Sequence, residues 1–521
     1  ALPIYVIIIG GGPVGVFLAI ELGLNNIKTL VLEKYATPLL SPRAQSLSSR
    51  SMEFLVRFGI NDKLKAKIVL GNDVPQEGVW CSKLNGQTYG VGSMNLALNN
   101  NDLSPEKYIR IPLWLTEDVL RQKLTTLTSV TFIKETQVKD IKLVDNLVVV
   151  DAESQNQIVN YKASYAIGCD GANSITRNKL KVHCLNLAPA RRVINILFET
   201  NELEQRITIE RGFIYYILEN RYPSVIGLVN PQSGLWYSQI VYDGEESDID
   251  KIDLNGLIDE ISGFSFNKKI IESHFWSMQP QIAERFSYQN KIFLVGDSAH
   301  AFVPTGGFGL NTGLAGALNL GWKLASVIKQ VAHPSILETY ELERRPIAMR
   351  NLEAAQHNAK NMVEIRKKHD PKTDPEGFAK ANSEAAVTHS QSLGLAMGYA
   401  YFDSPLTKLN NNQSIVQTSQ RIYTPKVEPG YFLPHTQIDG KPIYTKLSTI
   451  NWTLIINSTN DMHLIQLWLD QANNAKLKVE TLFVPVNTYP YRYILIRPDW
   501  HIAYTSNLLN NDYLTQNWQI K

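Results

Sequence analysis

The sequence predicts an α/β protein built from more than one domain. The chain has 521 residues, which is too long for one hydrophobic core. Its beginning alternates short β-branched runs with apolar helical segments, as in a parallel sheet covered by helices. Residues 187–277 change to alternating polar and apolar positions, which indicates an antiparallel sheet with one solvated face.

The composition excludes several classes of protein. A formal net charge of +2 gives no reason to expect a nucleic acid or an acidic partner. Three cysteines without a CxxC spacing argue against a disulfide framework and a metal site, and favour a reducing cytoplasm. No apolar run reaches the length of a membrane span, and the apolar start runs directly into a glycine motif, so we expect a core strand there.

The first element is a dinucleotide-binding unit of the Rossmann type. A β-branched run at residues 5–9 leads into a GxGxxG motif, an apolar helix to residue 24 and a second strand at residues 29–32. Gly10 makes the turn, Gly12 admits a pyrophosphate, and Gly15 lets the helix pack on the strand. A carboxylate after the second strand takes the ribose hydroxyls. The alternative is that the glycines serve only a tight turn. The predicted cofactor contacts are Gly10, Gly12, Pro13, Val14, Gly15, Glu33 and Lys34.

A second cofactor element lies at residues 291–325. An apolar strand ends in Gly296-Asp297, and a glycine-containing loop precedes a helix rich in Ala, Gly and Leu. Asp297 can accept hydrogen bonds from a polyol, while the helix start offers N–H groups and a positive dipole end. This pattern predicts the seat of the ribityl chain and isoalloxazine ring of a flavin. The residues predicted here are Gly296, Asp297, Pro304, Gly307, Gly309, Leu310 and Asn311, of which Pro304 and Gly307 form the catalytic ring loop; no side-chain base is assigned.

Three further positions have two readings each. Arg43 stands at a junction between a loop and a helix, where it either pairs with cofactor phosphates or stays a surface charge. Arg121 lies on a helix expected over residues 116–124 with Thr116 as its N-cap, and either reaches the cofactor or is solvated. Asp170-Gly171 ends another strand, where capping the next helix and serving the cofactor are compatible roles.

The central sheet carries aromatic residues at alternating positions. Such residues are more often core than pocket, but together they suit a flat aromatic ligand on one face of the sheet. The candidate substrate contacts are Tyr215, Tyr216, Trp236, Tyr237 and Gln239.

The remaining segments complete the expected architecture. Strands at residues 131–133, 139–143 and 147–151 suggest a β-meander, residues 328–359 a long helix, and the charged residues 367–379 a looping segment. From Pro429 onward the pattern predicts a small α/β domain. Its strands are expected at residues 453–456, 479–484, 493–496 and 502–505, and its helix at residues 461–474.

Three motifs, in their order along the chain, resemble those of a known family. GxGxxG near residue 10, CDGANSITR near residue 170 and GDSAH near residue 297 resemble the single-component FAD-dependent aromatic hydroxylases of the p-hydroxybenzoate and phenol hydroxylase kind. The segments PGYFLPH at 429–435 and IRPD at 496–499 are similar to the branch with a thioredoxin-like C-terminal domain, which contains phenol and aromatic polyketide hydroxylases. Without a CxxC, that domain has no thiol–disulfide role.

The resemblance implies a domain organisation. It comprises a Rossmann-type FAD-binding domain (residues 1–75, 102–180 and 285–400), an inserted antiparallel-sheet substrate domain (76–101 and 181–284) and a thioredoxin-like domain (429–521). Asp170-Gly171 would serve FAD and the nicotinamide cofactor, Gly296-Asp297 the ribityl chain, and Arg43 FAD. One departure is Leu113, where many members have a glutamine that approaches FAD; leucine offers no side-chain hydrogen bond.

The implied function is FAD-dependent monooxygenation. With NADPH or NADH and O2, a flavin C4a-hydroperoxide would hydroxylate a phenolic or polycyclic aromatic, polyketide-like molecule. Baeyer–Villiger insertion or epoxidation on the same scaffold, and a non-catalytic flavin- or ligand-binding protein, stay open as alternatives. His300 is expected to be structural, and the protein to be a cytoplasmic monomer or homodimer without a membrane span, a nucleic-acid partner or a metal.

Overall fold

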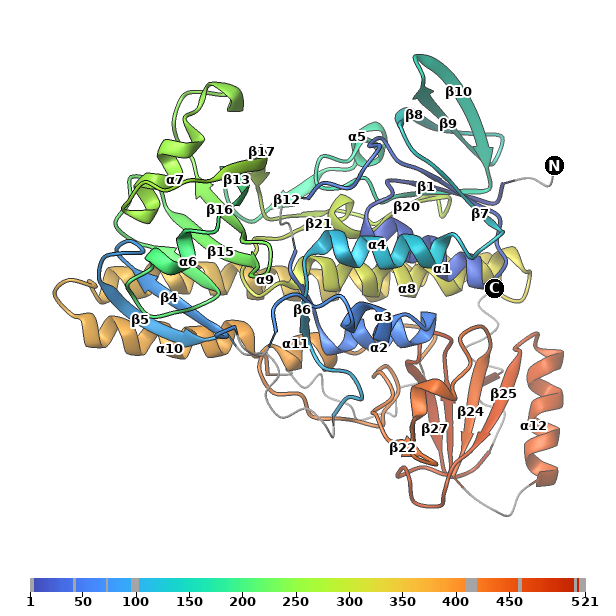
Figure 1. Ribbon diagram of the computed structural model, residues 1–521. Coiled ribbons are helices and arrows are strands. Elements are labelled where there is room, and N and C mark those ends of the chain that lie inside the picture. Colours follow the sequence, from blue (N-terminus) through green and yellow to red (C-terminus); the bar gives the residue numbers. More distant parts are fainter. Residues whose placement is uncertain are drawn as a thin grey trace.

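The structure is a computed structural model that describes residues 4–40, 44–71, 74–94, 103–407, 419–457, 462–509 and 513–514. Figure 1 shows three bodies: a helix-covered parallel sheet, an antiparallel sheet beside it, and a small α/β body formed by the C-terminal part of the chain.

The first body is built on a six-stranded sheet whose strands are β1 (Val6–Ile9), β2 (Thr29–Leu32), β7 (Val130–Ile133), β11 (Tyr165–Gly168), β19 (Ser287–Tyr288) and β20 (Ile292–Leu294). Their order is β19-β20-β11-β1-β2-β7, and all neighbours run parallel except β19 and β20. Strands β1 and β2 are buried at every residue, as expected for a sheet covered on both faces.

Two different layers cover this sheet. Helices α1 (Pro13–Leu24), α4 (Leu113–Leu124) and α8 (Phe308–Ile328) share a core with Val6, Ile8 and Val31. On the other face lie β8 (Thr136–Val144), β9 (Leu147–Ser154), β10 (Gln157–Ala163) and α5 (Ile175–Lys179). The first strand of the expected meander is therefore wrong. Residues 131–133 belong to the parallel sheet as β7, because the crossover through α4 returns this strand beside β2, and the meander consists of β8, β9 and β10.

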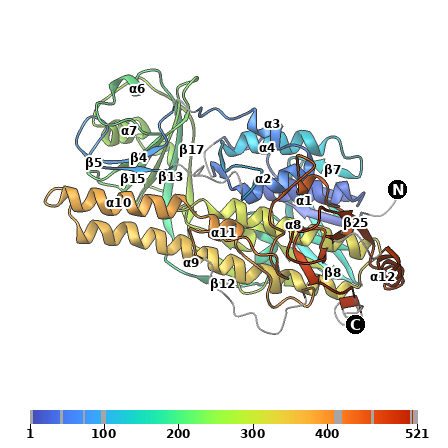
Figure 2. The ribbon, with the colours of Figure 1, turned by 90° about the horizontal axis from the view of Figure 1, so that it is seen from below.

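Long helices extend the first body towards the antiparallel sheet. They are α9 (Glu338–Lys368) and α10 (Pro375–Ser390), accompanied by α2 (Ser49–Phe58), α3 (Asn61–Lys65), α11 (Leu393–Met397) and η3 (Pro334–Leu337). Figure 2 shows α9 and α10 side by side, with α10 reaching the strands β4 and β5. Two short strands, β3 (Ser46–Leu47) and β6 (Ile109–Arg110), pair at the junction between the bodies.

Three expectations about helices and loops are wrong. The helix expected at residues 328–359 starts later and ends later, because α8 ends at Ile328 and α9 spans Glu338–Lys368. The looping segment is limited to residues 369–374, since Asp374 accepts a hydrogen bond from the N–H of Gly377 (3.1 Å) and starts α10. Thr116 lies inside α4 and is not its cap, because the helix starts directly after Pro112.

The second body is a seven-stranded sheet in the order β17-β13-β16-β15-β14-β4-β5. The strands are β4 (Glu77–Cys81), β5 (Thr88–Ser93), β13 (Arg191–Glu199), β14 (Ile214–Ile217), β15 (Ser224–Asn230), β16 (Leu235–Val241) and β17 (Lys269–Met278). One face packs under α6 (Leu203–Arg206), η1 (Ile249–Lys251) and α7 (Leu254–Ser262), and the other faces α10 and the first body. A small sheet of β12 (Cys184–Asn186), β18 (Gln281–Ala283) and β21 (His300–Ala301) connects the two bodies.

The third body has a four-stranded sheet in the order β25-β24-β26-β27. Strands β24 (Trp452–Ile456) and β25 (Val479–Phe483) are parallel and joined by α12 (Met462–Asn474), whereas β26 (Tyr493–Ile496) and β27 (Ile502–Ser506) are antiparallel. Short elements β22 (Gln437–Ile438), β23 (Lys441–Pro442) and η4 (Ile443–Thr445) precede them. The predicted strands and helix lie at these positions. The thioredoxin-like assignment and the domain boundaries stay predictions.

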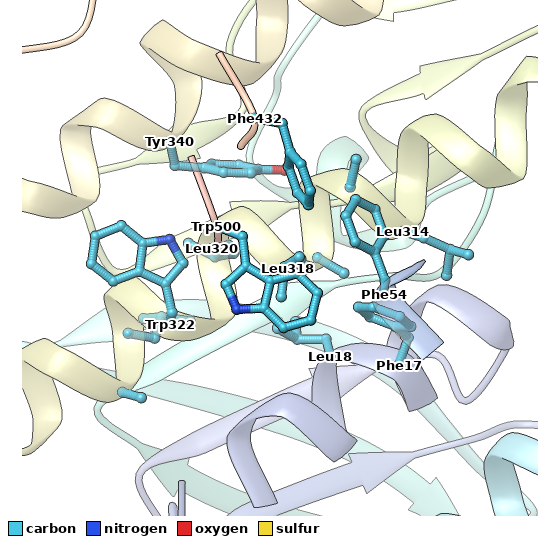
Figure 3. Close-up of a cluster of buried hydrophobic side chains, with 14 of the residues drawn as sticks. Phe17, Leu18, Phe54, Leu314, Leu318, Leu320, Trp322, Tyr340, Phe432 and Trp500 are labelled. Atoms are coloured by element: carbon cyan, nitrogen blue, oxygen red, sulfur yellow. The ribbon is translucent and has the colours of Figure 1, made fainter. Parts of the chain in front are cut away.

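The third body shares a hydrophobic core with the first. Figure 3 shows Phe432 and Trp500 of the C-terminal part among side chains of α1, α2 and α8. The rings of Phe54 and Phe432 lie 6.2 Å apart, and those of Trp322 and Trp452 lie 6.0 Å apart. The two bodies therefore pack as one unit.

A buried ionic cluster crosses the same contact. The Glu343 carboxylate on α9 accepts hydrogen bonds from both Nη atoms of Arg497 (2.7 and 2.9 Å) and from Lys323 Nζ on α8 (2.6 Å). Arg497 also pairs with Asp499 at 2.7 Å, and the side chains of these four residues are at most 2% exposed. Asn319 Nδ2 (2.6 Å) and Ser404 Oγ (2.5 Å) donate to the remaining positions on Glu343.

Replacing Arg497 tests how strongly this cluster holds the bodies together. Arg497→Met leaves Glu343 and Asp499 without their shared partner, so it should lower the free energy of unfolding by about 3 kcal/mol or more. The control is Lys139→Met at the solvent-exposed Lys139–Glu153 pair, which should cost less than about 1 kcal/mol. Denaturant unfolding measures both. Equal effects of the two substitutions would show that the buried cluster is not stabilising.

The cluster also predicts a pH dependence. Burial by itself raises the pKa of Glu343, but the charges of Arg497 and Lys323 outweigh it and hold the pKa of this carboxyl well below its ordinary value. The resulting stabilisation is complete above the ordinary glutamate pKa and is lost as the pH falls through the lowered pKa. Glu343→Gln should therefore reduce the loss of melting temperature between about pH 6 and pH 3, relative to wild type. Glu153→Gln serves as the exposed control, and an unchanged acid profile of Glu343→Gln would contradict the prediction.

Candidate functional site

The turn between β1 and α1 is shaped to admit a ligand on one side. Gly10 has φ +104°, and a Cβ on it would lie 2.3 Å from the carbonyl oxygen of Cys169. A Cβ on Gly15 would lie 2.1 Å from the carbonyl oxygen of Gly10, so α1 packs tightly against the turn. In contrast, no described atom lies within 4 Å of a Cβ on Gly12, the N-cap of α1. The open side coincides with the start of the helix, a position suited to a phosphate.

Two charged side chains meet this turn. Glu33 at the end of β2 accepts hydrogen bonds from the N–H of Gly11 (2.7 Å) and of Tyr35 (2.8 Å). Arg121 Nη2 on α4 donates to the carbonyl oxygen of Gly11 at 3.0 Å, so the structure places Arg121 at the turn and not in bulk solvent. Lys34 is exposed beside the ring of Tyr35. The arrangement fits the adenosine and pyrophosphate of a dinucleotide.

Asp170 follows β11, directly beside the first turn. It accepts hydrogen bonds from Ser174 Oγ (2.5 Å), the N–H of Thr176 (2.9 Å) and Thr176 Oγ1 (3.0 Å), and so fixes the start of α5. Space next to Gly171 is open, with no described atom within 4 Å of an added Cβ. Asp170 therefore caps α5, and the open space beside Gly171 leaves room for a cofactor. Arg43 lies outside the described residues.

The predicted flavin loop begins after β20. Asp297, in η2 (Gly296–Ser298), is exposed, and Gly296 packs against Val14 at the start of α1. Ser298 Oγ holds the turn by donating to the carbonyl oxygen of Gly168 at 2.5 Å. The second cofactor turn therefore lies against the first, as one dinucleotide bound across both strands requires.

The loop continues over Pro304, which is exposed, to the start of α8. Gly307 has φ +66°, and within the described part of the chain no side chain caps the helix that follows it. The first N–H groups of α8, including those of Gly309 and Leu310, therefore form an electropositive helix start suited to the flavin ring. Asn311 uses its side chain elsewhere: Oδ1 accepts from the N–H of Ser48 (2.8 Å) and from Ser51 Oγ (2.6 Å), which ties α8 to α2.

The antiparallel sheet separates the candidate substrate residues. Because side chains alternate along a strand, Tyr215 and Trp236 point into the core under α7, on the face away from the flavin loop. Tyr216, Tyr237 and Gln239 lie on the opposite face, in register with Gly227 and Val225 of β15. Tyr216 stacks on Trp80 at 5.0 Å between ring centroids. The structure thus brings three of the five candidates to the side that faces the first body.

Residues that the sequence did not single out connect this face to the flavin loop. A Cβ on Gly307 would lie 2.7 Å from Ser46 Oγ on β3, which pairs with β6. Arg110 on β6 donates to Gln76 Oε1 (3.1 Å) and to the carbonyl oxygen of Met94 (3.3 Å). Tyr108 hydrogen-bonds to the side chain of Ser46. Gln45, which precedes Ser46 in the chain, hydrogen-bonds to Tyr237. No motif marks these positions, because each depends on contacts between segments far apart in the chain.

The site also contains a buried histidine that has no catalytic role. His300 is buried between the rings of Phe286 and Phe302, and burial lowers its pKa to about 3, so it is neutral and structural.

A cavity of about 450 Å³ is lined by Gly306 and Gly307 and by the first turn of α2. Within the described ranges there is no cluster of three His, Cys, Asp or Glu suited to a metal ion, and no helix is long and apolar enough to cross a membrane.

Comparison with known proteins identifies the cofactor-binding part. Residues 4–355 match the family model described as an FAD binding domain. The FAD-dependent monooxygenase apdD of Emericella nidulans is 27% identical, with 95% of this chain and 87% of that protein covered. The 2,4-dichlorophenol 6-monooxygenase of Cupriavidus pinatubonensis is 24% identical, with 97% and 94% covered.

Solved structures share the fold over the whole chain. RebC with bound 7-carboxy-K252c superposes with a TM-score of 0.87 at 22% identity and covers 100% of both chains. A ternary complex of aklavinone-11 hydroxylase with FAD and aklavinone gives a TM-score of 0.81 at 19% identity and covers 99% of both chains. The predicted FAD cofactor and the resemblance to flavin-dependent aromatic hydroxylases are confirmed, and the chain belongs to the family of FAD-dependent monooxygenases that carry this FAD-binding domain.

Proposed function

We propose that the protein hydroxylates a phenolic or polycyclic aromatic small molecule, with O2 as the oxygen source and NADPH or NADH as the reductant. The observation that carries the proposal is the uncapped start of α8 at Gly307, which lies beside Ser46 of β3, while the neighbouring Gln45 hydrogen-bonds to Tyr237 on the sheet face. A protein that only stored a flavin would not need a polar helix start and an aromatic sheet face on the two sides of one loop.

The chain's own residues bind and orient the cofactor. The start of α1 at Gly12 takes the pyrophosphate, Glu33 the ribose hydroxyls, and Asp297 the ribityl hydroxyls. Arg121, already fixed at Gly11, lies near enough to the turn to add a positive charge there. Leu113 offers no hydrogen bond at its position. Each of these cofactor contacts is a proposal.

When bound, FAD supplies the redox chemistry, accepting electrons from the nicotinamide cofactor and activating O2. With FAD bound, the N–H groups at the start of α8 would stabilise negative charge on the flavin, because the helix dipole and fixed donors require no reorganisation. Pro304 and Gly307 would shape the loop that holds it. Tyr237, which is buried over Gly227, helps to exclude water from the substrate side.

A labelled-oxygen assay tests the reaction. In a panel of phenols and hydroxylated polycyclic ketones, one class should accelerate NAD(P)H oxidation, and its product should gain one atom from ¹⁸O₂ by mass spectrometry. A hydroxyl on the ring supports hydroxylation, while an inserted ester oxygen or an epoxide would support Baeyer–Villiger or epoxidising chemistry instead. Product without label in every case would refute monooxygenation.

The ribityl assignment is tested by Asp297→Ala. Loss of charged hydrogen bonds to the polyol should weaken FAD affinity by about tenfold or more. Asp170→Ala is the matched control, because Asp170 fixes α5 through three hydrogen bonds and its loss should lower the melting temperature of the FAD-free protein. Unchanged FAD affinity of Asp297→Ala, measured by flavin fluorescence, would exclude the assignment.

A further inference from the structure

The cavity of about 450 Å³ beside Gly306 and Gly307 is formed by helices and not by the antiparallel sheet. Its lining comes mainly from the starts of α2 and α8, from α9 and α11 and from residues 421–423, and no described strand of the seven-stranded sheet contributes to it. Figure 1 shows α11 next to α2, and the two helices are in contact. Arg421 and Ile422 are the exposed members of the lining, so the cavity opens there.

One buried positive charge at this cavity has no counterion. Arg344 on α9 lines the cavity and is 2% exposed. Its Nη atoms donate to Tyr401 Oη (3.2 Å) and to the carbonyl oxygen of Thr312 (3.3 Å), and over the described residues no carboxylate pairs with it. Burial raises the pKa of Tyr401 well above its ordinary value, so this phenol is neutral and does not balance the charge.

The carboxylates of nearby segments are paired with other cations. The ionic cluster described above balances Glu343, the residue before Arg344, and Asp499 against two cations, so it has no negative charge to spare. Glu53 pairs with Arg50, the other buried arginine of the lining. Because an uncompensated buried charge is strongly unfavourable, Arg344 favours an anion in the space beside it.

The lining combines unpartnered donors with apolar surface. Within the described part of the chain, Ser49 Oγ, Arg50 Nε and Arg344 Nε are buried without a hydrogen-bond partner, and all three can donate. Donors without acceptors favour an anionic ligand, and the apolar surface favours a flat ring. The aromatic and aliphatic residues that contribute this surface are Tyr108, Phe308, Leu393, Leu395, Tyr399 and Tyr423.

We propose that this cavity binds a small organic monoanion, a carboxylate on a flat apolar body, whose charge balances that of Arg344. One negative charge suffices, because Arg50 already has its carboxylate partner. Gly306 and Gly307 belong both to the cavity and to the proposed flavin loop, so a bound ligand touches that loop from the side of α2 and α11. The inference goes beyond the proposed hydroxylation and does not depend on it, since binding requires no turnover.

Water is the competing occupant of the cavity. Ordered water can satisfy the unpartnered atoms, but it does not neutralise Arg344. Three substitutions separate the two occupants. Arg344→Met removes the charge and keeps an apolar stem, whereas Arg344→Lys keeps the charge. Ala396→Leu on α11 narrows the cavity and leaves the arginine in place.

The experiment compares an acid with its amide. 6-Fluoro-2-naphthoate and 6-fluoro-2-naphthamide are titrated separately on the oxidised, FAD-loaded protein without NAD(P)H, and their ¹⁹F resonances give the two dissociation constants. Wild type should bind the acid about tenfold more tightly than the amide, because the pair with the guanidinium is charge-assisted. Arg344→Met should remove this preference, Arg344→Lys should keep most of it, and Ala396→Leu should weaken the binding of both compounds.

Arg345→Met is the matched control. Arg345 is the next residue on α9 and donates to the carbonyl oxygen of Ala283 (3.0 Å), but it is not part of the lining, so its loss should leave the preference for the acid unchanged. Equal affinities of wild type for acid and amide would overturn the inference and favour water. Acid binding that is unchanged in Arg344→Met or in Ala396→Leu would also overturn it, because the anion would then bind elsewhere. If Arg344→Met does not fold, Ala396→Leu decides alone by the same criterion.

Discussion

The position of α8 depends on one buried carboxylate, that of Glu343. It is approached by Arg497 from the third body and by Lys323 from α8, in a space that water does not reach. An unpaired charge in that environment would be strongly unfavourable, so the three elements keep their relative positions or lose the ion pairs together. Because α8 begins at the proposed flavin loop, the position of that loop also depends on this contact between the third body and the first.

The proposed cofactor site is a set of backbone features. Two strands end side by side, each followed by a turn that leaves open space in front of a helix start: Gly12 before α1, and Gly171 near α5. A third helix start without a side-chain cap follows Gly307. Side chains serve mainly to hold these turns, as Asp170, Ser298 and Asn311 do.

The parts of the fold that the sequence predicts are those determined by local pattern. The strand, turn and helix around Gly10, the turn at Gly296 and the strands and helix after residue 450 are visible as apolar runs with glycine or acidic ends. Alternation along β14 and β16 predicts two faces, but not which face meets the core. That depends on α7 covering Tyr215 and Trp236, a contact between segments remote in sequence. Arg110 carries no pattern at all, because its contacts with Gln76 and Met94 join segments that the fold brings together.

The buried pairing of Arg497 with Glu343 also bears on how such a protein can change over time. A domain joined only by a linker can be exchanged or lost as a unit, but here the third body supplies the partner of a charge in the interior of the first. Loss of residues 429–521 would leave Glu343 and Lys323 to compensate each other alone and would uncover Trp322 beside them. Residues on the two sides of this contact are therefore expected to vary jointly.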